Sequence, residues 1–154
     1  MNNLYMNNLK QENKIKNRMT WNEYFMEVAE FISKRSSCNR LSVGSVIVKN
    51  NRILATGYNG HIKGAEHTSL IEDGHEQMTI HSEINSICDC SGRGVSTKDA
   101  TIYITHFPCI NCTKAIIAAE INTIIYINDY KNNKICYDLM KLGKIKLIKL
   151  IKFQ

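Results

Sequence analysis

The stretch TIYITHFPCINCTKAIIAAEINTIIYIN, residues 101–128, decides the fold. It begins with a β-rich segment at 101–105, continues through a helical apolar stripe from Cys109 to about Glu120, and ends in the almost continuous apolar run 123–128. An unbroken apolar strand is expected where both faces of a sheet are covered. The stretch therefore predicts a strand, a helix and a second strand within a sheet that is flanked by helices.

The residues before this stretch predict a hairpin and a helix. Segments 43–49 and 52–58 are β-rich and enclose Asn50-Asn51. Because Asn tolerates positive φ, this pair predicts a tight turn. Farther upstream, Thr20 and Glu23 form a capping box, and apolar residues then recur at helical spacing to about Lys34. We therefore expect a first helix followed by a β-hairpin.

The remaining elements complete an α/β fold with a five-stranded mixed sheet. A helix is predicted at 81–90, another at 135–143 with Gly143 as its left-handed end residue, and a last strand at 144–152. The helix between the fourth and fifth strands implies that those strands run parallel. The glycine-rich segment between Tyr58 and Ile80 is long for a connection, so we expect it to be functional or partly structured.

Length and composition predict one globular domain. The chain has 154 residues, of which 44% are hydrophobic and 22% charged. We expect a weakly ordered arm at 1–18 and a single globular domain at 19–154. No run of about 18 apolar residues occurs, and the N-terminus lacks the apolar core of a signal peptide. A cytoplasmic protein without a membrane span is therefore the default expectation.

The basic net charge is concentrated at the two ends of the chain. The formal charge is +6, but residues 1–20 carry four Lys or Arg and one Glu, and residues 131–154 carry seven Lys and one Asp. The segment 21–130, which holds every chemical motif, has nine Lys or Arg against twelve Asp or Glu. This distribution indicates solvated ends, and it does not favour nucleic acid as a partner.

Cys109 and Cys112 predict half of a metal site. They follow Pro108, whose fixed φ suits a helix entry, and they lie on one face of the first helical turn. Thiolates at the positive end of a helix dipole have a lowered pKa and bind metal readily. A third protein ligand and a water molecule would complete a catalytic zinc site.

His81 is the predicted third ligand, and Glu83 is the predicted catalytic residue. Positions two apart within a helix point about 200° away from each other. His81 and Glu83 can therefore serve one site only if His81 lies just before the helix, in non-helical backbone. Glu83 then suits a proton shuttle, because a fourth protein ligand would leave no place for water. The pattern H-x-E followed by P-C-x-x-C matches the signature of zinc-dependent nucleobase deaminases.

The chain resembles the deoxycytidylate (dCMP) deaminases, especially their bacterial competence-operon branch. The likeness rests on WNEYFMEVAEFISKRSSCNRLSVGSVIV, ILATGYNG, IHSEINSI, IYITHFPCINCTKAIIAAEI and INDY. It implies a three-layer α/β/α cytidine-deaminase-like fold, a Zn²⁺ cofactor and hydrolysis of dCMP to dUMP. By position, Asn59 of GYNG and Tyr130 of INDY resemble substrate contacts. The family also implies a homo-oligomer, often a hexamer, with dCTP and dTTP as effectors.

Two departures from the family pattern fall near the site. Ser82 stands where the family usually has Ala, and we expect this change to be tolerated. Thr68 stands where many relatives have a Cys that helps to bind a second, structural zinc. Threonine is a poor zinc ligand, so the sequence leaves open whether Cys38, His67 and His75 still hold that ion. It also leaves the 5′-phosphate ligand open among Arg18, Arg40, Lys63 and Lys114.

Two alternative functions remain at this point. A deaminase acting on a base in tRNA or single-stranded DNA would use the same zinc chemistry, with the basic ends gripping the backbone. A non-catalytic zinc-binding module linked to DNA uptake would need no carboxylate at Glu83. A closed structural zinc site would need a fourth ligand, and none is evident in the sequence.

Overall fold

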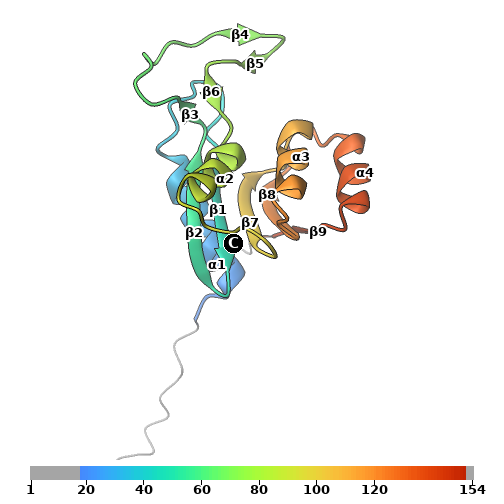
Figure 1. Cartoon of the computed structure of the whole chain (residues 1–154). Coiled ribbons are helices and arrows are strands. Elements are labelled where there is room, and N and C mark those ends of the chain that lie inside the picture. The colour runs from blue at the N-terminus through green and yellow to red at the C-terminus, as the bar shows by residue number, and fades with distance from the viewer. Residues whose placement is uncertain (1–17, 152–154) are drawn as a thin grey trace, which may run out of the picture.

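A five-stranded mixed sheet forms the centre of the computed structural model, which describes residues 18–151 (Figure 1). Its strand order is β2-β1-β7-β8-β9. The bounds are Gly44–Lys49 for β1, Arg52–Tyr58 for β2, Thr101–His106 for β7, Thr123–Asn128 for β8 and Lys146–Lys149 for β9. The predicted arm at 1–18 lies, apart from its last residue, outside the described residues.

The strand directions follow from the connections. β1 pairs antiparallel with β2 and with β7, whereas β7–β8 and β8–β9 are parallel. The β1–β2 turn places both Asn50 and Asn51 at positive φ, 52° and 56°, as the sequence predicts. The helices are α1 (Trp21–Ser33), α2 (Ser82–Gly92), α3 (Ile110–Ala118) and α4 (Lys134–Leu142). The predicted five-stranded mixed sheet is confirmed.

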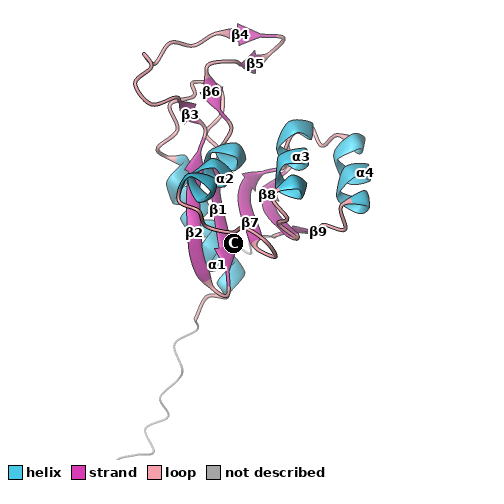
Figure 2. Cartoon of the chain, in the orientation of Figure 1, coloured by secondary structure: helices cyan, strands magenta, loops and turns pink. Residues whose placement is uncertain are grey.

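Two hydrophobic clusters fill the two faces of the sheet, giving three layers (Figure 2). On one face, Phe25 and Met26 of α1 pack with alternate strand residues such as Val46 and Tyr103. On the other face, the intervening residues, including Ile47 and Ile102, pack with α2, α3 and α4. This alternation arises because successive side chains of a strand point to opposite faces.

The long segment after β2 is partly structured. β3 (Gly60–His61) pairs with β6 (Thr79–Ile80), and β4 (Ile71–Glu72) pairs with β5 (His75–Glu76). In Figure 1 the β4–β5 hairpin projects away from the sheet, whereas β3 and β6 lie near the start of α2. The chain thus leaves and returns at one place, immediately before His81.

The end of α4 differs from the sequence prediction. Gly143 has a right-handed conformation with φ −76°, and the positive φ of 55° falls on Lys144 instead. A Cβ at Gly143 would lie 3.0 Å from the Ile117 side chain. The glycine is therefore explained by the close approach of α4 to α3. No helix within residues 18–151 is long and apolar enough to cross a membrane.

Candidate active site

His81 ends an extended segment and begins a helix. It is the N-cap residue of α2, with φ −63° and ψ 148°, and it follows directly on β6. Because this backbone is extended, the direction of the His81 side chain is not set by the helical geometry of the residues that follow it. Glu83, the second residue of α2, can therefore share a site with His81. The non-helical position expected for His81 is confirmed.

The two cysteines occupy the start of α3. Pro108 is fully buried between β7 and this helix, and Cys109 is the N-cap residue. The Cys112 backbone N–H donates to Cys109 Sγ at 3.5 Å, so one thiol caps the helix that carries the other. The exposed N–H groups and the dipole of this helix end favour negative charge on both sulfurs.

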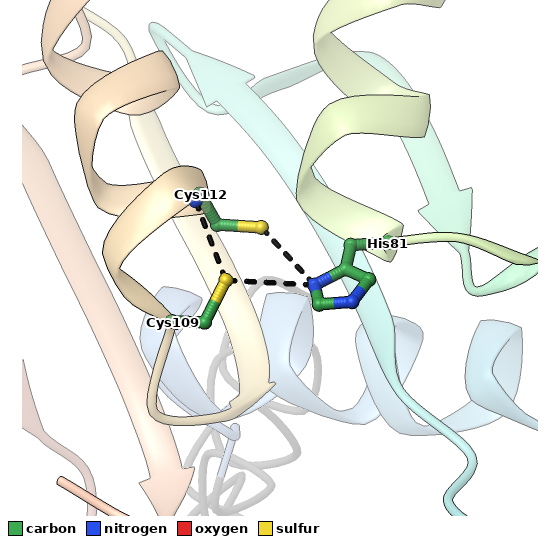
Figure 3. Close-up of side chains that lie close together, drawn as sticks. All are labelled: His81, Cys109 and Cys112. Carbon is green, nitrogen blue, oxygen red and sulfur yellow. Dashed lines mark hydrogen bonds between the residues drawn. The ribbon is translucent and has the colours of Figure 1, made fainter. Parts of the chain in front are cut away.

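His81, Cys109 and Cys112 converge from the two helix starts (Figure 3). His81 Nδ1 lies 3.6 Å from Cys109 Sγ and 3.4 Å from Cys112 Sγ. A tetrahedral zinc ion, with bonds of about 2.3 Å to sulfur and about 2.0 Å to nitrogen, separates such ligands by about 3.5 Å. The donor set and its spacing therefore fit zinc. Within residues 18–151 these three side chains are the only metal-competent group of three or more.

The two thiols differ in acidity. The hydrogen bond from Cys112, reinforced by His81, lowers the pKa of Cys109 to about 3 despite its burial. The same bond, together with burial and the nearby Glu83, raises the pKa of Cys112. The hydrogen bond to Cys109 raises the pKa of His81. Cys109 is thus the more acidic of the two thiols, and zinc binding would require both sulfurs to be deprotonated.

Glu83 lies buried beside the cluster. Only 4% of the residue is exposed, and burial raises the pKa of its carboxyl group. The Ser82 hydroxyl donates to Glu83 Oε2 at 3.0 Å. A carboxyl group with a raised pKa next to a metal site is suited to exchanging protons near neutral pH. This is the position and environment that a proton shuttle needs.

A single pocket joins these groups to the other predicted site residues. His81, Glu83 and Cys109 line it, and so do Asn59 and Tyr130. His106, whose pKa is lowered by burial, and Phe107 form another part of the wall. Five of the six predicted site residues therefore line the pocket, and the sixth, Cys112, is buried.

Asn59 is anchored to the chain that precedes β1. Its Oδ1 accepts hydrogen bonds from Ser36 Oγ at 2.7 Å and from the Val43 backbone N–H at 2.8 Å. Its Nδ2 donates to the Leu41 carbonyl at 2.6 Å. The side chain thus organises one wall of the pocket, and its substrate contact stays a prediction.

Arg40 and Tyr130 meet at the other side of the pocket. Arg40 Nη1 donates to the Tyr130 hydroxyl at 2.6 Å, and its guanidinium carbon lies 5.6 Å from the centroid of the Tyr130 ring. Arg40 is the only Lys or Arg among the residues that line this pocket. Of the four phosphate-binding candidates, the structure places this one at the site. Arg18 lines a separate groove beside Trp21.

The second zinc site of the relatives has no counterpart among residues 18–151. Cys38 and His75 both line the pocket, but they form no metal-competent group with His67. The His67 ring instead stacks on His61, with centroids 4.7 Å apart. His61 is held by Ser37 Oγ through Nδ1 and by the Thr68 carbonyl through Nε2. Thr68 therefore contributes its backbone carbonyl oxygen, and not its side chain, to the contact with His61.

Sequence reasoning missed three features of the site. It gave no role to His106, left Arg40 among several cations, and expected only tolerance of Ser82. Arg40 gains its place through a contact between segments far apart in the chain, because its bond to Tyr130 spans 90 positions. A weak signal existed for Arg40, because it lies in the quoted stretch RSSCNRLSVG.

Comparisons with known proteins agree with this geometry. A family model described as the cytidine and deoxycytidylate deaminase zinc-binding region matches residues 19–128. ComE operon protein 2 of Bacillus subtilis is 46% identical over 128 residues, which cover 80% of this chain and 68% of that protein. The deoxycytidylate deaminase of Schizosaccharomyces pombe is 32% identical over 142 residues, which cover 84% of this chain and 44% of the yeast protein.

A solved structure shows the same fold in full. The crystal structure of dCMP deaminase from the cyanophage S-TIM5 in complex with dCMP and dUMP matches with a TM-score of 0.77 and 31% identity. The match covers 86% of this chain and 100% of the phage chain. The chain thus spans the whole phage enzyme but less than half of the yeast protein.

Proposed function

This chain belongs to the cytidine and deoxycytidylate deaminase family, and on that premise we propose that it hydrolyses dCMP to dUMP and ammonia. One observation carries the proposal. Two helix starts bring His81, Cys109 and Cys112 together with zinc-like spacing, and the buried Glu83 opens into the same pocket. The similarity to a phage enzyme solved with dCMP and dUMP supports the choice of substrate.

His81, Cys109 and Cys112 would hold the zinc ion. When bound, zinc supplies an acidified water molecule as the nucleophile for C4 of cytosine. The Glu83 carboxylate accepts a proton from the attacking water. It passes this proton to ring N3, and then carries the second proton, from the hydroxyl group now on C4, to the amino group, which leaves as ammonia. Water is consumed, uracil is formed, and Glu83 ends in its starting state.

Burial of Glu83 serves this proton transfer. A carboxylate in water has a pKa near 4.3 and is a weak base at neutral pH. Burial raises the pKa of Glu83, so that the carboxylate binds the proton of water more strongly and still releases it to the substrate. His106 and Phe107 complete the wall of the pocket and limit access of bulk water.

The nucleotide would lie between the zinc cluster and the Arg40–Tyr130 pair. A guanidinium presents a planar fork of donors that matches a phosphate group. Arg40 uses one nitrogen on Tyr130, so its other donors are directed to the 5′-phosphate in this proposal. Asn59 and Tyr130 would contact the sugar or base, as the family resemblance implies. Oligomer formation and regulation by dCTP or dTTP belong to the same proposal.

Deamination of a base in a nucleic acid is the main rival. It would need a cationic track leading to the pocket. Arg40 lines this pocket, Lys131 lines an adjoining one that shares His81 and Tyr130, and the segment 21–130 is mildly acidic. The charge distribution therefore favours a small nucleotide. The non-catalytic alternative leaves unexplained why a carboxylate is buried beside three metal ligands.

Ammonia release tests these possibilities together. The zinc-loaded protein is assayed on cytidine, dCMP, dCTP and a tRNA substrate, with and without a chelator. We expect turnover of dCMP that is abolished by the chelator and restored by Zn²⁺. Turnover of tRNA alone, with strong dependence on salt, would replace this proposal by the nucleic-acid rival. Absence of ammonia from every cytosine compound would support a non-catalytic module.

A further inference from the structure

A cluster of fully buried serines lies at the start of α2. Ser45, Ser82 and Ser86 are each 0% exposed. Ser45 Oγ lies 2.8 Å from the Ser82 carbonyl oxygen and 3.0 Å from Ser86 Oγ. Ser86 Oγ donates to the Glu83 carbonyl at 3.0 Å. These contacts fasten the backbone of the first turn of α2 to strand β1.

The first turn of α2 is also held from β2. A Cβ at Gly57 would lie 2.2 Å from the Ser82 carbonyl oxygen, so the helix touches the strand backbone at this point. The position of the Ser82 backbone is thus set by two neighbouring strands. The backbone that carries the Ser82 hydroxyl group is therefore held in place.

Unlike the other two serines, Ser82 contacts the carboxylate itself. Its Oγ donates to Glu83 Oε2 at 3.0 Å, and both residues are buried. A carboxylate has about four lone-pair sites on its two oxygens. The Ser82 bond occupies one of them and, together with the Glu83 backbone N–H, resists rotation of the group, while sites left open can exchange protons.

We propose that Ser82 is a positioning residue, whose hydroxyl holds the Glu83 carboxylate in the orientation needed for proton transfer. This inference rests on the proposed function, because it assigns Ser82 a part in the reaction that Glu83 performs. A purely structural hydroxyl would affect stability without affecting turnover. A positioning hydroxyl lowers kcat and leaves the binding of substrate unchanged.

Ser82→Ala is compared with Ser45→Ala, its matched control. Both variants remove one fully buried hydroxyl from the same cluster, but only Ser82→Ala removes the bond to the carboxylate. For Ser82→Ala we expect kcat for dCMP to fall about tenfold, as for loss of one hydrogen bond to a charged group, with KM and zinc content unchanged. For Ser45→Ala we expect a clearly smaller fall of kcat, because this variant loosens a backbone contact at Ser82 but leaves the bond to the Glu83 carboxylate in place.

A double variant tests whether the two residues act together. With Glu83→Gln already in place, adding Ser82→Ala is expected to leave the residual rate unchanged, since the group being positioned is gone. An equal fall of kcat in Ser82→Ala and Ser45→Ala, or an unchanged kcat in Ser82→Ala, would overturn the inference.

A structural measurement separates this inference from the proposed function. In a crystal structure of the zinc-loaded Ser82→Ala protein, the Glu83 carboxylate is expected to rotate or to occupy two orientations. In the zinc-loaded wild type it is expected to occupy one. A carboxylate that keeps a single wild-type orientation in the variant contradicts the inference, whatever substrate the enzyme uses. Failure of the wild type to deaminate dCMP contradicts only the proposed function.

Discussion

The Arg40 guanidinium donates a 2.6 Å hydrogen bond to the Tyr130 hydroxyl, although the two residues lie 90 positions apart in the chain. Arg40 comes from the segment before β1, and Tyr130 follows β8. Their bond joins two loops at the edge of the pocket that also contains His81 and Glu83. The pair thus places a positive charge at a defined side of the site.

Replacing Arg40 by alanine tests the phosphate contact. We expect KM for dCMP to rise at least about tenfold, as for loss of one charge-assisted contact, while any turnover of cytidine changes little. The measurement is steady-state ammonia release with both substrates. Lys114→Ala, which removes an exposed cation on α3, is the control and is expected to behave as the wild type. Equal losses on dCMP and cytidine would show that Arg40 only shapes the pocket.

Replacing Glu83 by glutamine tests the proton shuttle. The amide keeps the shape of the side chain but cannot accept and return a proton. We expect kcat for dCMP to fall by at least about 10³-fold, with zinc content unchanged. Metal analysis and ammonia release provide the two measurements. A variant that deaminates at the wild-type rate would falsify the assigned role.

Replacing Cys112 by alanine tests the metal centre. Cys112 is buried, and its sulfur lies 3.4 Å from His81 Nδ1. We expect loss of bound zinc and a melting temperature lower by on the order of 10 °C, because metal binding stabilises the folded state. Cys88→Ala removes an exposed thiol from α2 and is the control, with zinc content and stability retained. Full zinc occupancy in Cys112→Ala would require a different ligand set.

Replacing Gly57 by alanine tests the contact between β2 and α2. The added Cβ would lie 2.2 Å from the Ser82 carbonyl oxygen and 2.8 Å from the Ser86 nitrogen. Both are backbone atoms, so the helix must move. We expect a loss of about 2–3 kcal/mol in the free energy of unfolding, together with reduced zinc affinity, since His81 caps the same helix. Chemical denaturation and metal titration measure the two effects.

Gly92→Ala is the matched control for this substitution. Gly92 is the last residue of α2, and a Cβ there meets nothing within 4 Å. Alanine has the higher helix propensity, so we expect stability unchanged or higher by up to about 1 kcal/mol. If both variants lose stability equally, close packing against β2 is not the cause.

The sheet and the zinc cluster could be predicted from the sequence because the turns and helix starts that form them are determined by residues close together in the chain. The Asn50-Asn51 turn, the Thr20 capping box and the helix starts at His81 and Cys109 are decided within a few residues. The β3–β6 and β4–β5 pairs escaped prediction because each strand has only two residues, too few for a periodic pattern.

The contacts of the pocket wall could not be predicted in the same way. Asn59 reads as part of a turn, yet its amide is engaged by Ser36, Leu41 and Val43, which precede β1. Such partners depend on how distant segments are brought together by the folded sheet. Gly143 shows the same limitation, because the reason for a residue without a side chain at this position is the close approach of Ile117 in α3.

The pairing of β3 with β6 brings the two ends of the projecting segment together. Gly60 lies opposite Ile80 and His61 opposite Thr79, so the segment between the two strands begins and ends at the same two-stranded ladder. Residues 62–74 do not themselves line the catalytic pocket, but Ser69 and Leu70 donate hydrogen bonds to Glu76, which does line it. Changes in the projecting segment can therefore reach the pocket wall through Glu76, without altering the three metal-ligating side chains.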